Sequence, residues 1–148
     1  MNPPELKKLD AHCLSEFKEL LRVFSDVFQT PPEEVADDNH LNKLLARTDF
    51  ICIAVIADNK VAGGLTAYEM PSYQGNYSEV YLYDIAVKQE YQRKGFGNLL
   101  IRSLKDYCKT HNIKTIFVEA HEEDTDAVNF YHTTKASAEK VIHFNYYL

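Results

Sequence analysis

The sequence predicts one α/β domain in which helices flank a mixed, mostly antiparallel sheet with a central pair of parallel strands. Three observations predict it: apolar residues at helical spacing near the N-terminus, β-rich runs in the middle, and then a strand, a helix and a strand in succession. Such a succession forms a right-handed crossover between parallel strands, so the other strands are expected to pair in antiparallel fashion. With 148 residues, 45% of them hydrophobic, the chain suits a single domain over residues 1–148.

Two helices are expected before the sheet. The stretch "LSEFKELLRVFSDVF", residues 14–28, carries apolar residues at helical spacing. The stretch "PPEEVADDNHLNKLLART", residues 31–48, offers a second, shorter helix in an acidic region. Ahead of both, "ELKKLD" is compatible with a short first strand.

The middle of the chain predicts a β-hairpin followed by a further strand. Residues 50–57 and 61–69 are both rich in apolar and β-branched residues, which is typical of strands. The turn between them contains Asp58 and Asn59. The next strand is expected at residues 79–87.

The last third of the chain alternates helices and strands. The expected elements are, in order, a helix that begins within residues 96–98, a buried strand at 114–120, a helix at 125–134 and a final strand at 140–148. Asp124 or Thr125 is expected to cap the helix at 125–134, because short oxygen-bearing side chains accept hydrogen bonds from the first N–H groups of a helix.

The charge of the chain restricts its partners. The net charge is −6, from 22 acidic and 16 basic residues, which argues against a nucleic acid or an anionic membrane, because neutralising phosphates needs a basic surface. A cationic substrate fits this charge better. The longest apolar runs are too short to span a bilayer, and the N-terminus has no apolar leader segment. We therefore expect a cytoplasmic protein.

The cysteines and histidines do not form a metal-binding pattern. Cys13, Cys52 and Cys108 are odd in number and scattered, which predicts small buried apolar residues and not a disulfide framework. The six histidines are scattered as well, and none lies in an H-E-x-x-H motif. No metal is expected.

The turn "QRKGFG" after the strand at 79–87 has the features of a pyrophosphate cradle. Gly95 and Gly97 let the backbone approach a ligand closely, and the first N–H groups of the following helix have no partner within the helix. Together these features bind anions. Arg93 and Lys94 add positive charge. The pattern lacks the Lys and Ser or Thr of a Walker loop and the third glycine of a Rossmann turn. Alternatively, the turn is an ordinary helix start with exposed basic residues.

The pattern Q-x-x-G-x-G between an apolar strand and an apolar helix, followed by "AVNFY", resembles the GNAT superfamily of acetyl-CoA-dependent N-acetyltransferases over nearly the whole chain. Within it, "SEVYLYDIAV", "VAGGLTAYEMP" and the closing "HF" resemble the aminoglycoside 3-N-acetyltransferases. The resemblance implies a GNAT fold, acetyl-CoA as cosubstrate and a role in antibiotic resistance. It also implies acetyl-CoA contacts at a set of residues, which are Ile85, Ala86, Val87, Gln92, Arg93, Lys94, Gly95, Phe96 and Gly97. The family's glycine after the "FY" segment is absent here, where Lys135 and Ala136 lie.

Asp84 is the candidate catalytic base. Acetyl transfer needs a neutral amine, and an alkylamine with a pKa of about 10.4 is almost entirely protonated at pH 7. Asp84 is expected to share a strand face with Val80, Leu82 and Ala86. A carboxylate on an apolar face gains basicity from partial burial, so it can accept the proton of the amine directly or through water. Alternatively, Asp84 pairs with a Lys or Arg, or lies exposed at a bulge.

Tyr131 is the second candidate catalytic residue. The resemblance implies that its phenol protonates the departing CoA thiolate, while a backbone N–H near Val87 polarises the thioester carbonyl. A helix tyrosine of this kind can equally serve packing alone.

Acidic residues near the expected strand ends are candidates for substrate binding. A polycationic amine would be attracted and oriented by such carboxylates, and tyrosines would offer hydroxyls and flat faces. The candidate substrate contacts are Glu79, Tyr83, Glu119 and Asp124. The acidic loop at 119–126 could equally be a solvated surface.

The sequence therefore predicts an N-acetyltransferase that acts on an amine of a polycationic small molecule, foremost the 3-amino group of an aminoglycoside, by direct transfer. Acetylation of another polyamine or of a peptide amine is the first alternative. A non-catalytic acyl-CoA-binding sensor is the second. A homodimer is also expected, because the final strand could pair with a neighbouring copy.

Overall fold

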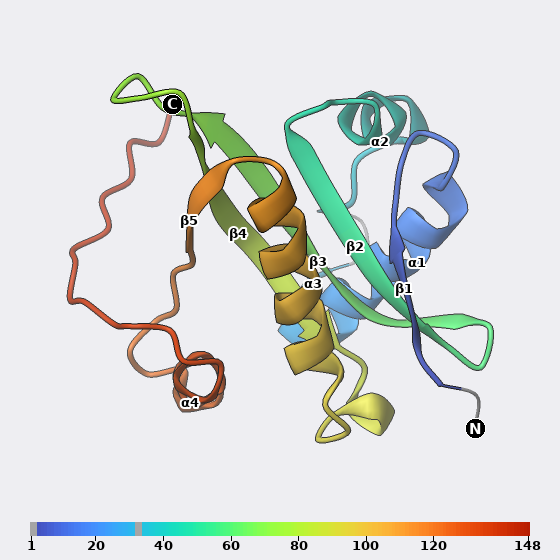
Figure 1. The fold of residues 1–148 in the computed structure, drawn as a ribbon. Coiled ribbons are helices and arrows are strands. Elements are labelled where there is room, and N and C mark those ends of the chain that lie inside the picture. The colour runs from blue at the N-terminus through green and yellow to red at the C-terminus, as the bar shows by residue number, and fades with distance from the viewer. Residues whose placement is uncertain (1–2, 32–33) are drawn as a thin grey trace. The chain divides into compact units, whose positions relative to one another are not determined.

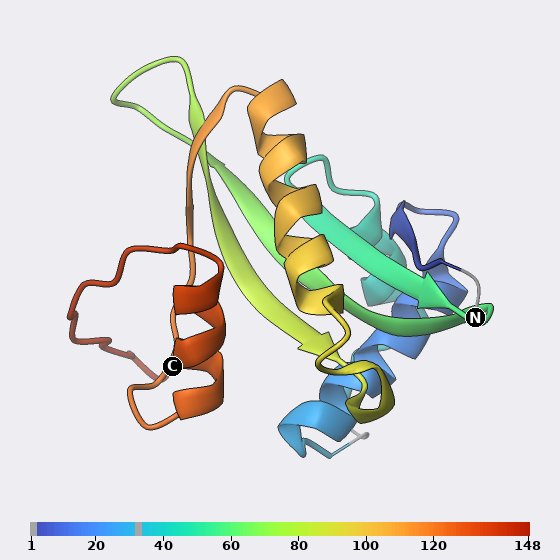
Figure 2. The same cartoon turned by 60° about the horizontal axis from the view of Figure 1, so that its bottom comes forward.

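The computed structural model describes residues 3–31 and 34–148, so residues 32 and 33 of the expected second helix lie outside the described residues. The chain divides into two compact units, Met1–Val118 and Glu119–Leu148, which we call the N-terminal and the C-terminal unit. The N-terminal unit contains a five-stranded sheet and three α-helices within its described residues (Figures 1 and 2). No helix in the described part of the chain is long and apolar enough to cross a membrane.

The sheet is mixed, as the sequence predicts. Its strands follow chain order, and they are β1 (Glu5–Lys8), β2 (Phe50–Ala57), β3 (Lys60–Pro71), β4 (Ser78–Val87) and β5 (Ile113–Phe117). The first four pair with their neighbours in antiparallel fashion, and β4 pairs with β5 in parallel. The expected pair of parallel strands is thereby confirmed, but it lies at the edge of the sheet and not at its centre. The β2–β3 turn has Asp58 and Asn59 at φ of 51° and 61°, which matches the turn preferred by two-residue hairpins.

Helices cover both faces of the sheet. The helices are α1 (Leu14–Phe28), α2 (Asp38–Leu45) and α3 (Phe96–Thr110). Figure 1 shows α3 in front of the sheet and α1 with α2 behind it. The N-terminus of α2 is capped by Asp37, whose carboxylate accepts a hydrogen bond of 2.9 Å from the N–H of His40.

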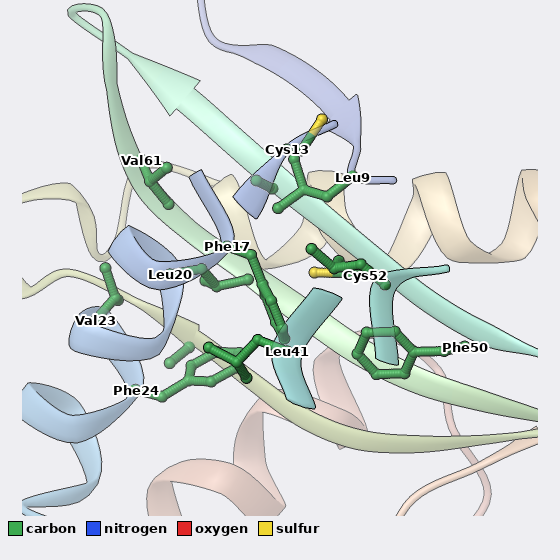
Figure 3. Packing of buried hydrophobic residues seen from close by; sticks show 13 residues of the cluster. Leu9, Cys13, Phe17, Leu20, Val23, Phe24, Leu41, Phe50, Cys52 and Val61 are labelled. Atoms are coloured by element: carbon green, nitrogen blue, oxygen red, sulfur yellow. The ribbon is translucent and has the colours of Figure 1, made fainter. Parts of the chain in front are cut away.

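The face of the sheet under α1 and α2 holds a buried apolar cluster (Figure 3). Phe17 and Leu20 of α1 pack there with Leu41 of α2 and with Phe50 and Cys52 of β2. All three cysteines are buried and free, as expected from the sequence. The cluster fixes which face of each strand points toward α1 and α2.

Two expectations about the last third of the chain were wrong. The strand predicted at 114–120 as buried is the edge strand β5, in which only Ile113 is fully buried. Residues 136–148 contain no strand, although one was expected at 140–148. A strand requires a neighbouring strand to pair with, and among the described residues no strand pairs with residues 140–148.

The C-terminal unit contains α4 (Thr125–Thr133), as predicted. Asp124 caps this helix by accepting a hydrogen bond of 3.1 Å from the N–H of Ala127. The helix contains no buried residue. The residues after it form an extended segment without regular structure (Figure 1).

Candidate active site

Asp84 lies on β4 directly after a β-bulge. Thr66 of β3 pairs with Asp84, and the next residue of β3, Ala67, pairs with Leu82. Tyr83 is therefore the extra residue, which has no partner of its own on β3. Because residues directly opposite each other share a face, the bulge changes the face to which Asp84 belongs.

The bulge corrects the expected surroundings of Asp84. Thr66 pairs with Cys52 of the apolar cluster, so Asp84 lies on the face of α1 and α2. Leu82 lies on the opposite face, because it pairs with Ala67. Asp84 thus shares a face with Ala86, as expected, but not with Val80 and Leu82. The one-residue insertion exchanges the faces of β4, and the alternation of the sequence alone does not reveal it.

Asp84 is a half-buried carboxyl group. Burial raises its pKa above the ordinary value of an aspartate, because a charge is less well solvated there than in water. Within the described residues, no Lys or Arg forms an ion pair with it. A carboxylate that has a raised pKa and no ion pair with a basic side chain is suited to accept a proton.

The turn after β4 is built to present backbone N–H groups. A short 3-10 helix (Gln89–Tyr91) follows the strand, and the side-chain amide of Gln92 donates a hydrogen bond of 2.9 Å to the carbonyl of Val87. Gly95 then precedes α3 at a φ of 83°, a conformation that side chains rarely adopt. No side chain caps α3 among the described residues, so its first N–H groups stay available to a ligand.

The space above this turn is open. A Cβ atom built on Gly95 would meet no heavy atom within 4 Å. Phe96 is buried and stacks on Tyr91 at 5.6 Å between ring centroids, so its side chain anchors the turn and only its backbone can face a ligand. Arg93 and Lys94 are exposed, and the Lys94 ammonium lies 5.5 Å from the Tyr91 ring centroid. This combination fits a pyrophosphate group.

The end of β4 contacts glycines of β3. Gly63 pairs with Val87, and a Cβ atom on Gly63 would lie only 2.5 Å from the carbonyl oxygen of Ala86. The side chain of Ala86 is buried, whereas Ile85 and Val87 are half-buried. The close approach of β3 therefore fixes the backbone of residues 85–87, which were predicted to contact the cofactor.

Two of the predicted substrate contacts lie on the face of Asp84. Glu79 pairs with Met70 and lies two residues before Tyr81, which pairs with Tyr68 of the same face. Tyr83 is exposed at the bulge. The sequence did not point to Phe117, which stacks on Tyr81 at 5.0 Å between ring centroids. The parallel register of β4 and β5 places these two residues side by side. Only a prediction of this register could have identified the contact from the sequence.

The other predicted residues belong to the C-terminal unit. Tyr131 is half-buried on α4, with its ring 5.3 Å from that of Phe130. Glu119 contacts the imidazole Nδ1 of His143 at 3.1 Å. Asp124 uses a carboxylate oxygen as the N-cap of α4. No group of three or more metal-ligating side chains occurs in the described ranges.

A helix N-terminus without a side-chain cap, which follows a strand with a half-buried carboxylate, is the arrangement expected of an enzyme that transfers a group from a phosphate-bearing cofactor. Residues 14–134 match the Acetyltransferase (GNAT) family, and the chain belongs to this family. It is accordingly a GNAT acetyltransferase, of a family that uses acetyl-CoA. The fold and the family implied by the sequence motifs are both confirmed.

Solved structures with high similarity include two of the aminoglycoside acetyltransferase meta-AAC0020 from an uncultured soil metagenomic sample, in complex with trehalose and with sisomicin. They are 34% and 33% identical to this chain, and each match covers 98% of this chain and 96% of the other at a TM-score of 0.95. The aminoglycoside acetyltransferase HMB0005, also from an uncultured soil metagenomic sample, is 27% identical over 99% of both chains at a TM-score of 0.94.

A curated relative has a different acceptor in its name. The [Ribosomal protein bS18]-alanine N-acetyltransferase of Salmonella typhimurium is 32% identical over 69 residues, which are 47% of this chain and 46% of that protein. The match thus spans about half the length of this curated relative.

Proposed function

We propose that this enzyme acetylates an amino group of a polycationic small molecule, foremost the 3-amino group of an aminoglycoside, by direct transfer from acetyl-CoA. The observation that carries the proposal is the half-buried Asp84 on the face of α1 and α2, without a basic partner among the described residues. The similarity to aminoglycoside acetyltransferases over 98% of the chain supports this choice of acceptor.

Asp84 acts as the base in this proposal. It removes a proton from the ammonium form of the acceptor, directly or through a water molecule, because only the neutral amine is a nucleophile. Its raised pKa brings the carboxylate closer to the amine in basicity and so makes the transfer of the proton less unfavourable. The net charge of −6 adds an attractive field for a polycation.

Acetyl-CoA supplies the acetyl group as an activated thioester. We propose that the N–H groups and basic side chains of residues 92–97 hold its pyrophosphate and that the backbone of residues 85–87 contacts its pantetheine arm. A backbone N–H near Val87 would stabilise negative charge on the thioester oxygen. The phenol of Tyr131 would donate its proton to the leaving sulfur.

The proposed acceptor contacts are Glu79, Tyr83, Glu119 and Asp124. Carboxylates attract the ammonium groups of the acceptor, and the Tyr83 ring offers a flat face to a sugar. Asp124 keeps one carboxylate oxygen outside its hydrogen bond to the N–H of Ala127, because a carboxylate accepts through two oxygens.

A peptide α-amine is the second candidate acceptor. The local similarity to the ribosomal-protein alanine N-acetyltransferase favours it. We place either reaction in the cytoplasm, where acetyl-CoA is available. We also propose a homodimer, because the exposed apolar residues of the last segment, among them Ile142 and Phe144, would gain cover from a second copy.

The proposal is tested by the release of CoA from acetyl-CoA with purified enzyme and a panel of acceptors, which comprises sisomicin, spermidine and a peptide with an N-terminal alanine. We expect turnover with sisomicin and a loss of roughly 100-fold in kcat in Asp84→Asn, which is typical for a missing general base. Binding of acetyl-CoA, measured by calorimetry, should persist in the variant. Preferred turnover of the alanine peptide would favour the second candidate.

A further inference from the structure

Four aromatic rings form a continuous ladder across β3, β4 and β5. Tyr68 contacts Tyr83 at 5.7 Å between centroids, Tyr83 contacts Tyr81 at 5.8 Å, and Tyr81 stacks on Phe117 at 5.0 Å. Tyr83 meets both neighbouring rings nearly at right angles, at 79° and 81°. The ladder lies on the face of α1 and α2, since Tyr68 packs against the buried cluster of that face.

Tyr83 is in this ladder because of the bulge. Strict alternation would put residues 83 and 84 on opposite faces, but the extra residue lets both side chains lie on one face. Tyr83 remains 58% exposed although it contacts two rings. A large apolar ring held in place by its neighbours and still open to solvent is typical of a binding surface.

The charges on this face are complementary to a cation. The strand residues of the face in β3, β4 and β5 include two carboxyl groups, Glu79 and Asp84, and no Lys or Arg. The nearby Arg47 is paired with Asp49 through two hydrogen bonds of 2.9 and 2.7 Å. The pKa of Tyr68 is raised by burial and further by the proximity of Tyr83, because two ionised phenols close together would repel each other.

We propose that the ring of Tyr83 is a specificity-determining residue, which holds a second ammonium group of a polycationic acceptor while Asp84 serves the reacting amine. The proposal rests on the function proposed above and narrows its acceptor to molecules with at least two separated cations. The face of a phenol ring attracts a cation through its quadrupole, and the fixed ring loses little conformational freedom on binding. A monoamine leaves this contact unused.

The test compares sisomicin, which carries several amino groups, with cyclohexylamine, which carries one. The variants are Tyr83→Ala, Tyr83→Phe and, as a matched control, Tyr73→Ala, which removes a tyrosine that is 98% exposed and outside the ladder. We expect Tyr83→Ala to raise the KM for sisomicin and to lower the ratio of kcat/KM for sisomicin over cyclohexylamine roughly tenfold, as for the loss of one cation–π contact. Tyr83→Phe and Tyr73→Ala should keep this ratio within about twofold, because both variants retain an aromatic ring at position 83.

Three outcomes would overturn the proposal. An unchanged ratio in Tyr83→Ala would show that the ring does not select polycations. An equal loss in Tyr83→Phe would assign the effect to the hydroxyl. An equal loss for both amines would assign it to a general disturbance of the site.

Calorimetric binding separates this proposal from the proposed function. If wild-type enzyme acetylates neither amine, the function fails, but the affinities for sisomicin and cyclohexylamine still test the ladder. Tighter binding of sisomicin that Tyr83→Ala abolishes would support the aromatic contact. Equal binding of both amines would refute it.

Discussion

Different kinds of interaction stabilise the interior of each of the two units of this chain. Every fully buried side chain among the described residues lies in the N-terminal unit. The C-terminal unit is held instead by exposed polar contacts, such as the ion pair of Lys140 with Glu122 at 3.5 Å and the contact of His143 with Glu119 at 3.1 Å. Exposed ion pairs contribute only about 0–1 kcal/mol each. The C-terminal unit therefore has little stability of its own.

The difference separates the proposed catalytic groups. Asp84 and the turn at residues 92–97 belong to the N-terminal unit, where a buried sheet fixes the backbone. Tyr131 belongs to the C-terminal unit, whose helix α4 contains no buried residue. The proposed base thus lies in a sheet with a buried core, whereas the proposed acid lies on a helix without a buried residue.

The largest expected effect comes from the core of the N-terminal unit. Leu20 is fully buried, and its methyl groups leave no room for a Cβ atom on Gly64 of β3. Leu20→Ala should lower the free energy of unfolding by about 3–4 kcal/mol, because it removes buried methyl groups and leaves a cavity. Urea unfolding followed by circular dichroism measures this loss.

The control is Val27→Ala at the exposed end of the same helix, where the side chain is 36% exposed. Its cost should stay near or below about 1 kcal/mol, the centre of the distribution for ordinary substitutions. If both variants lose the same amount, the packing of α1 on the sheet does not dominate the stability of this unit.

The success of sequence-based prediction follows the same division. The helix Leu14–Phe28, the hairpin around Asp58 and the helix after Gly95 were predicted closely, because local apolar spacing and turn residues determine them. The final strand was predicted from β-rich composition alone. Its formation depends on a partner, which composition does not specify.

The candidate site was predicted in part. The sequence pointed to Asp84 and to the cradle at 92–97 because their residue types are unusual on an apolar strand and at a helix start. It assigned Asp84 to the wrong neighbours, because the bulge at Tyr83 depends on the pairing of β3 with β4. The contact of Tyr81 with Phe117 likewise depends on pairing between distant segments.

A smaller effect is expected from Asp84, whose burial as a charged group should lower the stability of the N-terminal unit. Because burial raises the pKa of Asp84, the folded state favours the protonated carboxyl. This contribution to stability is present below the ordinary pKa of the carboxyl group and is lost as the pH rises through its raised value in the folded protein. Asp84→Asn, which cannot ionise, should therefore be more stable than the wild type at pH 7 and lose this advantage in acid.

Thermal unfolding at several pH values measures the difference. A gain of about 1 kcal/mol would raise the midpoint by roughly 2–4 °C in a chain of this size. The control is Glu90→Gln, which alters an exposed carboxyl group. A gain in Asp84→Asn that grows toward low pH would contradict the assigned cause.

The smallest effect is expected in the C-terminal unit. Ile142 is 79% exposed, although its side chain is aliphatic and of the same size as that of the buried Leu20. In dilute protein, Ile142→Ala should change the free energy of unfolding by no more than about 0.5 kcal/mol, as for surface substitutions in general. Urea unfolding at increasing protein concentration tests whether a second copy of the chain buries Ile142. A cost that grows with concentration is the result expected from the proposed homodimer, because a second copy would then bury the side chain. A cost of several kcal/mol at every concentration would place Ile142 in a core of its own chain and would remove the contrast between the two units.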